Sequence, residues 1–116
     1  MARKQSARSK TGRTVLVIDD DREYLATTER LLARDGHHVI ALDDPAEALA
    51  LLQRERVDLV LVDFFMPQMT GEAFVQELRR FNHLVQVILQ TGYASEQPPR
   101  DLLKRLDIQG YYDKSE

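Results

Sequence analysis

The sequence predicts an α/β fold: one doubly wound, open sheet of five parallel strands with helices on both faces. Two observations support this prediction. Short apolar runs alternate along the chain with segments whose apolar residues recur at helical spacing, which gives the order βαβαβαβαβ. Several of these runs are continuous rather than alternating, as is typical of strands buried on both faces. A chain of 116 residues is the length of a single domain.

The first three elements follow from apolar pattern and stop signals. Val15–Ile18 is a β-branched and leucine run and is predicted to be a buried strand. Arg22–Arg34 has its leucines at helical spacing, and Gly36 is its expected stop. His38–Leu42 is the second predicted strand.

The middle of the chain begins with a helix-start signal. Asp44 is placed as an N-cap before Pro45, and Glu47 follows three residues after the cap, so a helix over Ala46–Arg54 is predicted. Val57–Val62 is another continuous apolar run and the third predicted strand.

Four further elements complete the alternation. They are a helix and a strand, then a short helix entered through two prolines, and a last strand: Gly71–Phe81, Val85–Leu89, Pro99–Leu106 and Ile108–Asp113. A sheet covered on both faces would carry one more helix after the last strand. We therefore expect the last helix to be absent from this chain and the domain to be C-terminally incomplete.

Charge is distributed unevenly along the chain. Residues 1–13 hold five basic and no acidic residues, whereas the rest of the chain holds 11 basic and 19 acidic residues. The first segment also lacks large apolar residues, so we predict a basic disordered tail over 1–13 and a folded domain over 14–116. A solvated leader is the favoured interpretation of the tail, and nucleic acid is not expected to bind the domain itself. The chain has no cysteine, no secretory signal and no apolar run that could span a membrane, which indicates a cytoplasmic protein.

Polar residues follow several predicted strands at their carboxyl ends. Asp19 and Asp20 follow the first strand, and Asp63 follows the third. Thr91 and Lys114 follow the fourth and fifth. Ligands of open α/β sheets bind beyond this edge. If the strand order is 2-1-3-4-5, the first and third strands are neighbours about 4.8 Å apart, and the three aspartates share one pocket.

Three carboxylates in one pocket repel one another. A pair at about 4 Å costs on the order of 4 kcal/mol at an effective dielectric of 20. A hard dication removes this cost, and carboxylate oxygens suit Mg²⁺. Acids combined with one hydroxyl and one ammonium also form an apparatus for phosphoryl transfer, with a carboxylate as the nucleophile.

Four motifs, taken in order and spacing, resemble the response-regulator receiver family of two-component signalling. They are V-L-V-I-D-D-D, D-L-V-L-V-D-F-F-M-P-Q-M-T-G, V-I-L-Q-T-G and G-Y-Y-D-K, and they extend over most of the chain outside the tail. The resemblance implies a flavodoxin-like sheet of order 2-1-3-4-5. It also implies a phosphorylation-dependent switch rather than an enzyme that turns over a foreign substrate.

The resemblance assigns a role to individual positions. Asp63 is implied as the phosphoacceptor, and the metal ligands implied are Asp19, Asp20, Asp63 and the backbone carbonyl of Phe65. Thr91 and Lys114 are implied to contact the phosphoryl group. Thr91 and Tyr111 are the implied switch pair, with Gly92 leaving room for Thr91 to move.

The resemblance also implies partners. The phosphoryl donor would be a sensor histidine kinase or a phosphotransfer protein, and Mg²⁺ would be the cofactor. An output domain on the C-terminal side is expected in the intact protein, and a homodimer is compatible with this interpretation.

Two other functions remain open at this point. The domain could be a docking module whose pocket is intact but unused. It could also be a phosphatase with an aspartyl nucleophile, but such enzymes carry a second acid two residues after the nucleophile, where this chain has Phe65. Asp21 is interpreted as a helix cap only, and Tyr112 as a packing residue.

Overall fold

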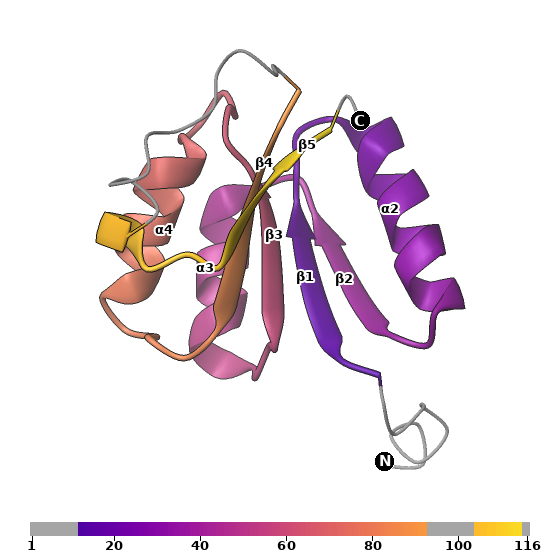
Figure 1. Cartoon of the computed structure of the whole chain (residues 1–116), viewed down its shortest axis with the longest axis horizontal. Helices are drawn as coiled ribbons and strands as arrows, with labels where there is room; N and C mark the ends of the chain where they lie inside the picture. The colour runs from indigo at the N-terminus through magenta and orange to yellow at the C-terminus, as the bar shows by residue number, and fades with distance from the viewer. Residues whose placement is uncertain (1–11, 93–103, 115–116) are drawn as a thin grey trace.

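The structure is a computed structural model that describes residues 12–92 and 104–114. Its elements, in chain order, are β1 (Thr14–Ile18), α2 (Arg22–Arg34), β2 (His38–Leu42), α3 (Pro45–Arg54), β3 (Leu59–Asp63), α4 (Gly71–Arg79), β4 (Gln86–Thr91) and β5 (Gly110–Asp113) (Figure 1). Strands and helices alternate as the sequence predicts as far as β4.

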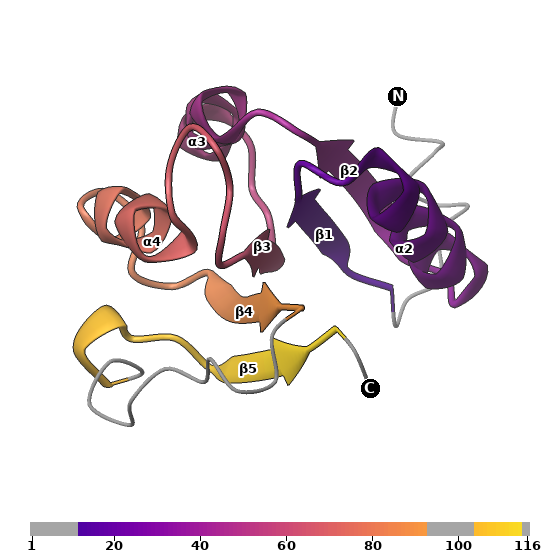
Figure 2. The ribbon, with the colours of Figure 1, turned by 90° about the horizontal axis from the view of Figure 1, so that it is seen from above.

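All five strands are parallel and lie in the order β2-β1-β3-β4-β5. The order 2-1-3-4-5 and the flavodoxin-like α/β fold predicted from the sequence are thereby confirmed. Helix α2 lies on one face of the sheet and packs on β1 and β2, while α3 and α4 lie together on the other face (Figure 2). The carboxyl ends of the strands therefore meet at one edge, with helix starts around them.

The two sides of each strand feed two separate cores. In β1, Leu16 and Ile18 join the larger cluster, whereas Val15 and Val17 join the smaller one. The larger cluster includes Phe74, Val75 and Leu78 of α4 and is fully shielded from solvent there. The smaller cluster is closed by Leu25 of α2. Continuous apolar strands are needed because both faces bury side chains.

Side-chain caps fix where α2, α3 and α4 begin. The Asp21 carboxylate accepts hydrogen bonds from the backbone N–H groups of Glu23 and Tyr24, which makes it the N-cap of α2. Asp44 and Thr70 cap α3 and α4 in the same way. The predicted start at Asp44-Pro45 is confirmed, with the helix beginning at Pro45 itself. Asp21 is a cap, as the sequence indicates.

Several bounds differ from the sequence predictions. Strand β4 runs over Gln86–Thr91 rather than Val85–Leu89, because its ladders with β3 and β5 extend to Gln90 and Thr91. Strand β3 runs over Leu59–Asp63 rather than Val57–Val62, because Asp58 instead bonds the backbone of Thr14 through its own N–H and carboxylate. Helix α4 ends at Arg79 rather than Phe81, because the next two N–H groups turn to carbonyls three residues back.

The last strand is also shorter than predicted. It starts at Gly110 rather than Ile108, because Asp107 has a left-handed backbone (φ 55°) and the Gln109 side chain takes the place of a ladder acceptor for the Val87 N–H. Most of the predicted helix Pro99–Leu106 lies outside the described residues, and 104–106 are helical.

The chain before β1 is described from residue 12 onward. Residues 1–11 of the predicted tail lie outside the described part. The Arg13 N–H donates to Nδ1 of the His37 side chain, and the Arg13 carbonyl accepts from the backbone N–H of His38. Within residues 12–92 and 104–114, every helix is too short or too polar to cross a membrane.

One buried guanidinium fastens the end of α4 to the last loop. Arg79 donates hydrogen bonds to four backbone carbonyls on two segments of the chain, those of Asn82, Val85, Leu106 and Asp107. Its side chain is only 11% exposed. Arg79 thus positions the turn that leads into β5, and with it the approach to Lys114.

We expect Arg79→Met to lower the free energy of unfolding by about 2–4 kcal/mol, because several carbonyls lose a charged donor. Urea unfolding followed by circular dichroism measures this change. Arg80→Met is the matched control: Arg80 is exposed and pairs with Glu77 on the surface, so its loss should cost no more than about 0.5 kcal/mol. Equal losses for the two variants would contradict this role of Arg79.

Candidate functional site

The register of two neighbouring strands brings the predicted carboxylates together. Ile18 of β1 lies beside Val62 of β3, so the residues that follow, Asp19 and Asp63, emerge side by side at the carboxyl edge. Asp19 and Asp63 are buried and Asp20 is exposed. One carboxylate oxygen from each of the three lies within 4.8 Å of the others. The sequence prediction of one shared pocket agrees with this geometry.

The loop after Asp63 is held by a close backbone approach at Gly71. A Cβ atom on Gly71 would lie 2.7 Å from the carbonyl oxygen of Asp63 and 2.9 Å from Cα of Phe64. The Gly71 N–H also donates to the Phe64 carbonyl. Only glycine fits between this loop and the start of α4. The glycine at the end of the motif therefore fixes the backbone that carries Asp63.

Lys114 brings the ammonium group to the carboxylates. Its Nζ lies 2.8 Å from Oδ2 of Asp19 and 3.5 Å from Oδ1 of Asp63. The Lys114 backbone N–H donates to the Thr91 carbonyl at 2.7 Å, so the end of β5 is anchored to the end of β4. The fifth strand thus delivers one positive charge into a pocket built by the first and third.

Burial and like charge shape the ionisation of the pocket. Burial, and then the neighbouring carboxylate of Asp19, raise the pKa of Asp63 from 3.8 to about 6, although Lys114 acts in the opposite direction. Burial opposes the charge on Lys114, but its hydrogen bond and charge contact with Asp19 outweigh this effect and raise its pKa. One ammonium does not balance the three carboxylates, and the pocket keeps an excess of negative charge.

The donor set of the pocket fits a hard dication. The cavity has a volume of about 350 Å³, and it is lined by Asp19, Asp20, Asp21, Asp63, Phe65, Gly92 and Lys114. Carboxylate oxygens at this separation and an exposed Asp20 suit an ion that keeps some of its water ligands, as Mg²⁺ does. The repulsion among the carboxylates is the term that such an ion would relieve.

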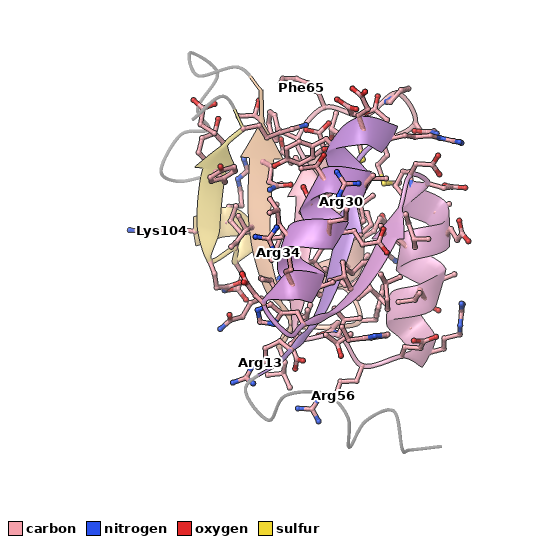
Figure 3. All side chains as sticks on the ribbon, turned by 90° about the vertical axis from the view of Figure 1, so that its right-hand side faces the viewer. Arg13, Arg30, Arg34, Arg56, Phe65 and Lys104 are labelled. Atoms are coloured by element: carbon pink, nitrogen blue, oxygen red, sulfur yellow. The ribbon has the colours of Figure 1, made fainter. Side chains whose placement is uncertain are left out.

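The remaining predicted residues lie around this pocket. Thr91 is completely buried at the end of β4, and the next residue, Gly92, lines the pocket with open space where a Cβ would be. Tyr111 of β5 is partly buried and packs against the larger core. Phe65 lines the pocket while its side chain is 42% exposed, and it lies at the strand-end edge of the molecule (Figure 3).

Two residues near the site were not anticipated from the sequence. Tyr24 of α2 places its ring 4.2 Å from Nζ of Lys114, and the buried Gln90 of β4 donates a hydrogen bond to the Tyr24 hydroxyl. A glutamine within an apolar strand, one residue before Thr91, was the available signal. Its partner could not be found by spacing, because Tyr24 comes from a distant part of the chain.

Comparison with known proteins identifies the class of domain. Residues 15–116 match the family described as the response regulator receiver domain, and the chain belongs to this family. The family resemblance drawn from the sequence is confirmed. Domains of this class are signalling switches of two-component systems, phosphorylated on an aspartate in the presence of Mg²⁺, rather than conventional enzymes.

Individual relatives agree with the family. The transcriptional regulatory protein CpxR of Klebsiella pneumoniae is 40% identical over 82 residues, which are 71% of this chain and 34% of CpxR. The chain thus matches about a third of that relative's length.

Solved structures agree as well. A CheY-like receiver domain of Methanospirillum hungatei has a TM-score of 0.80 at 26% identity, covering 90% of this chain and 82% of that one. The response regulator TrrA of Thermotoga maritima, solved with Mg²⁺ and BeF, has a TM-score of 0.77 at 25% identity, covering 88% of this chain and 86% of that one.

The raised pKa of Asp63 predicts a pH dependence of stability in the absence of a dication. A carboxyl whose pKa is higher in the folded protein than in the unfolded chain favours folding below about pH 4, and this contribution is lost as the pH rises through about 6. Between pH 5 and 7.5 in chelator, the wild type should therefore lose about 1–1.5 kcal/mol relative to Asp63→Asn. Urea unfolding at both pH values measures the difference, and parallel pH profiles for the two proteins would refute it.

Proposed function

We propose that Asp63 is the phosphoacceptor of this receiver domain. The observation that carries the proposal is the position of Asp63, buried at the end of β3 with Lys114 Nζ at 3.5 Å and two further carboxylates beside it. A carboxylate nucleophile needs positive charge near the oxygens of the incoming phosphoryl group, and Lys114 places one such charge beside Asp63.

The metal ligands would be Asp19, Asp20 and Asp63, with the backbone carbonyl of Phe65 as the fourth protein donor. When bound, Mg²⁺ supplies charge neutralisation for the carboxylates and for the phosphoryl oxygens. At neutral pH the Asp63 carboxyl, with a pKa of about 6, is largely ionised and able to attack. The family resemblance and the carboxylate geometry both support this ligand set.

The transfer itself exchanges one bond to phosphorus for another. An oxygen of Asp63 forms the new O–P bond, while the N–P bond of a donor phosphohistidine breaks and the released imidazole takes up a proton. We propose a sensor histidine kinase or a phosphotransfer protein as this donor. Lys114 then exchanges its contact with the Asp63 carboxylate for one with a phosphoryl oxygen.

The same site would work as a switch through two residues on neighbouring strands. In this proposal the Thr91 hydroxyl donates a hydrogen bond to a phosphoryl oxygen, and the Tyr111 side chain repacks as Thr91 moves. The open space at Gly92 leaves room on the pocket side of β4. Phosphorylation would thereby change the face around β5, which an output domain of the intact protein reads.

Incubation with a small phosphodonor and Mg²⁺ should add one phosphoryl group per chain, detected by intact-mass spectrometry. Asp63→Asn should abolish the addition, and chelator should suppress it in the wild type. Asp43→Asn is the matched control, because Asp43 follows the neighbouring strand β2 and pairs with Arg22 at the surface. A phosphoryl group retained by Asp63→Asn, or lost in Asp43→Asn, would refute the assignment.

We also propose that Phe65 slows hydrolysis of the phosphoryl group. Water must approach the phosphorus opposite the Asp63 oxygen, and the side chain two residues after the phosphoacceptor flanks that path in the family's geometry. Phe65 lines the pocket and offers no group that could orient water. The Phe65 ring packs edge-on against the Phe64 ring, with centroids 4.8 Å apart, and this contact restricts the movement of the Phe65 ring. Tyr93, the second residue expected to flank this path, lies outside the described residues.

Phe65→Asn should accelerate dephosphorylation by up to about 10²-fold, because an amide can position the attacking water. The decay of the phosphorylated protein after removal of the donor, followed by mass spectrometry, measures this rate. Phe81→Asn is the matched control, since Phe81 is similarly exposed at 39% but follows α4 at the opposite edge of the sheet. Unchanged or slower decay in Phe65→Asn would show that this side chain does not gate the water.

A further inference from the structure

Tyr24 connects three elements of the site on the α2 side of the sheet. Its ring, in the first turn of α2, lies under the ammonium group of Lys114 with Nζ 4.2 Å from the ring centroid. Its hydroxyl accepts a hydrogen bond of 3.1 Å from Nε2 of Gln90, which belongs to β4. The residue therefore touches both the lysine that follows β5 and the strand that ends in Thr91.

We propose that Tyr24 is a positioning residue for phosphoryl transfer: its ring holds the Lys114 ammonium at the carboxylates, and Gln90 holds the ring. This proposal deepens the function proposed above and rests on it. The chemical partner of the ring is the lysine of the same chain, and neither Tyr24 nor Gln90 is proposed to touch the phosphoryl group.

A lysine needs such support because its side chain is long and flexible. Four rotatable bonds allow the ammonium group to swing into water, where it is strongly hydrated. In this structure the Lys114 side chain is only 15% exposed, with Asp19 at 2.8 Å on one side and the Tyr24 ring at 4.2 Å on another. A cation over an aromatic face is attracted by the ring quadrupole, and the attraction grows as water is excluded. The ring thus favours the conformation that lies next to Asp63.

Gln90 can hold the Tyr24 ring in place because its own side chain and backbone are held by the sheet. Its side chain is buried in the sheet, and its backbone lies in the β3–β4 ladder beside Asp63. Among residues 12–92 and 104–114, Oε1 of Gln90 has no hydrogen-bond partner, and the bond from Nε2 to Tyr24 is the polar contact shown for this amide. A buried amide that keeps only one bond loses much if that bond breaks. The Tyr24 hydroxyl is therefore tied to the strand that carries Thr91.

The contact between the Tyr24 ring and Lys114 should increase the rate of phosphorylation. Lys114 must be beside Asp63 when the phosphoryl group arrives, and every conformation in which it swings away is unproductive. Removing the ring should slow phosphorylation by about 3- to 10-fold, the factor expected from loss of a partly shielded cation–aromatic contact. Removing only the hydroxyl should slow it by less, because the ring face remains.

The experiment compares Tyr24→Leu, which removes the ring, with Tyr24→Phe, which retains it. The first readout is NMR of the unphosphorylated, Mg²⁺-free protein. The Cε protons of Lys114 should show an upfield ring-current shift in the wild type and in Tyr24→Phe, and should lose it in Tyr24→Leu. The second readout is the rate of phosphorylation by a small phosphodonor with Mg²⁺. Phe81→Leu is the matched control, because Phe81 is an exposed aromatic residue that follows α4 and does not line the pocket.

We expect slow phosphorylation of Tyr24→Leu, a near-wild-type rate for Tyr24→Phe and an unchanged rate for Phe81→Leu. Tyr24→Met repeats the test if Tyr24→Leu does not fold, as judged by its amide spectrum. A Lys114 signal that is indifferent to the ring overturns the inference, as does a wild-type rate in a folded Tyr24→Leu. A wild type that takes no phosphoryl group, yet keeps the ring-dependent Lys114 shift, refutes the proposed function and leaves the contact established.

Discussion

The crowding of three carboxylates at one edge of the sheet is the constraint on which the rest of this structure depends. Parallel pairing of β1 with β3 forces Asp19 and Asp63 to emerge side by side, and Asp20 follows directly. Like charges at such distances repel by several kcal/mol unless a cation stands among them. Lys114 supplies part of that charge from the end of β5, so the last strand is bound to the first and third by electrostatics as well as by its ladder with β4.

The balance that Lys114 leaves incomplete is what makes the pocket useful. A site with a full set of counter-charges would not attract a dication, and the dication in turn offsets the negative charge that would otherwise repel an electrophile bearing negative oxygens. Here the pKa of Asp63 remains raised to about 6 in spite of Lys114, which shows that burial and Asp19 outweigh the ammonium. The protein therefore holds a strained arrangement of charge, and any ligand that relieves the strain in the folded state stabilises that state. Affinity for a cation and a cost in stability without it have the same origin.

The strand order, the carboxylates of the site and Lys114 could be predicted from the sequence, because each follows from local pattern. The apolar runs before Asp19 and Asp63 predict the strands, and because parallel strands end at the same edge of a sheet, the positions of the two aspartates follow. The sequence did not predict the contacts of Tyr24 and Gln90 or the four carbonyl contacts of Arg79. Those contacts join elements far apart in the chain, and they depend on the angle at which a helix lies on the sheet, which no periodicity specifies. The starts of β3 and β5 differ from the predicted ones for a related reason, since the side chains of Asp58 and Gln109 replace ladder partners there.

The two faces of the sheet support the site in different ways, and Thr91 stands between them. On the α3 and α4 side, the support is an apolar core that includes Leu89 and against which Tyr111 packs. On the α2 side, the support is polar, with Gln90 bonded to Tyr24 and the ring of Tyr24 beneath Lys114. The carbonyl of Thr91 is also bonded to the Lys114 backbone. A displacement of Thr91 toward a phosphoryl group would therefore pull on an apolar contact and a polar one together. Because packed cores resist small continuous deformation, such a pull favours two discrete arrangements over a graded response, as a switch requires.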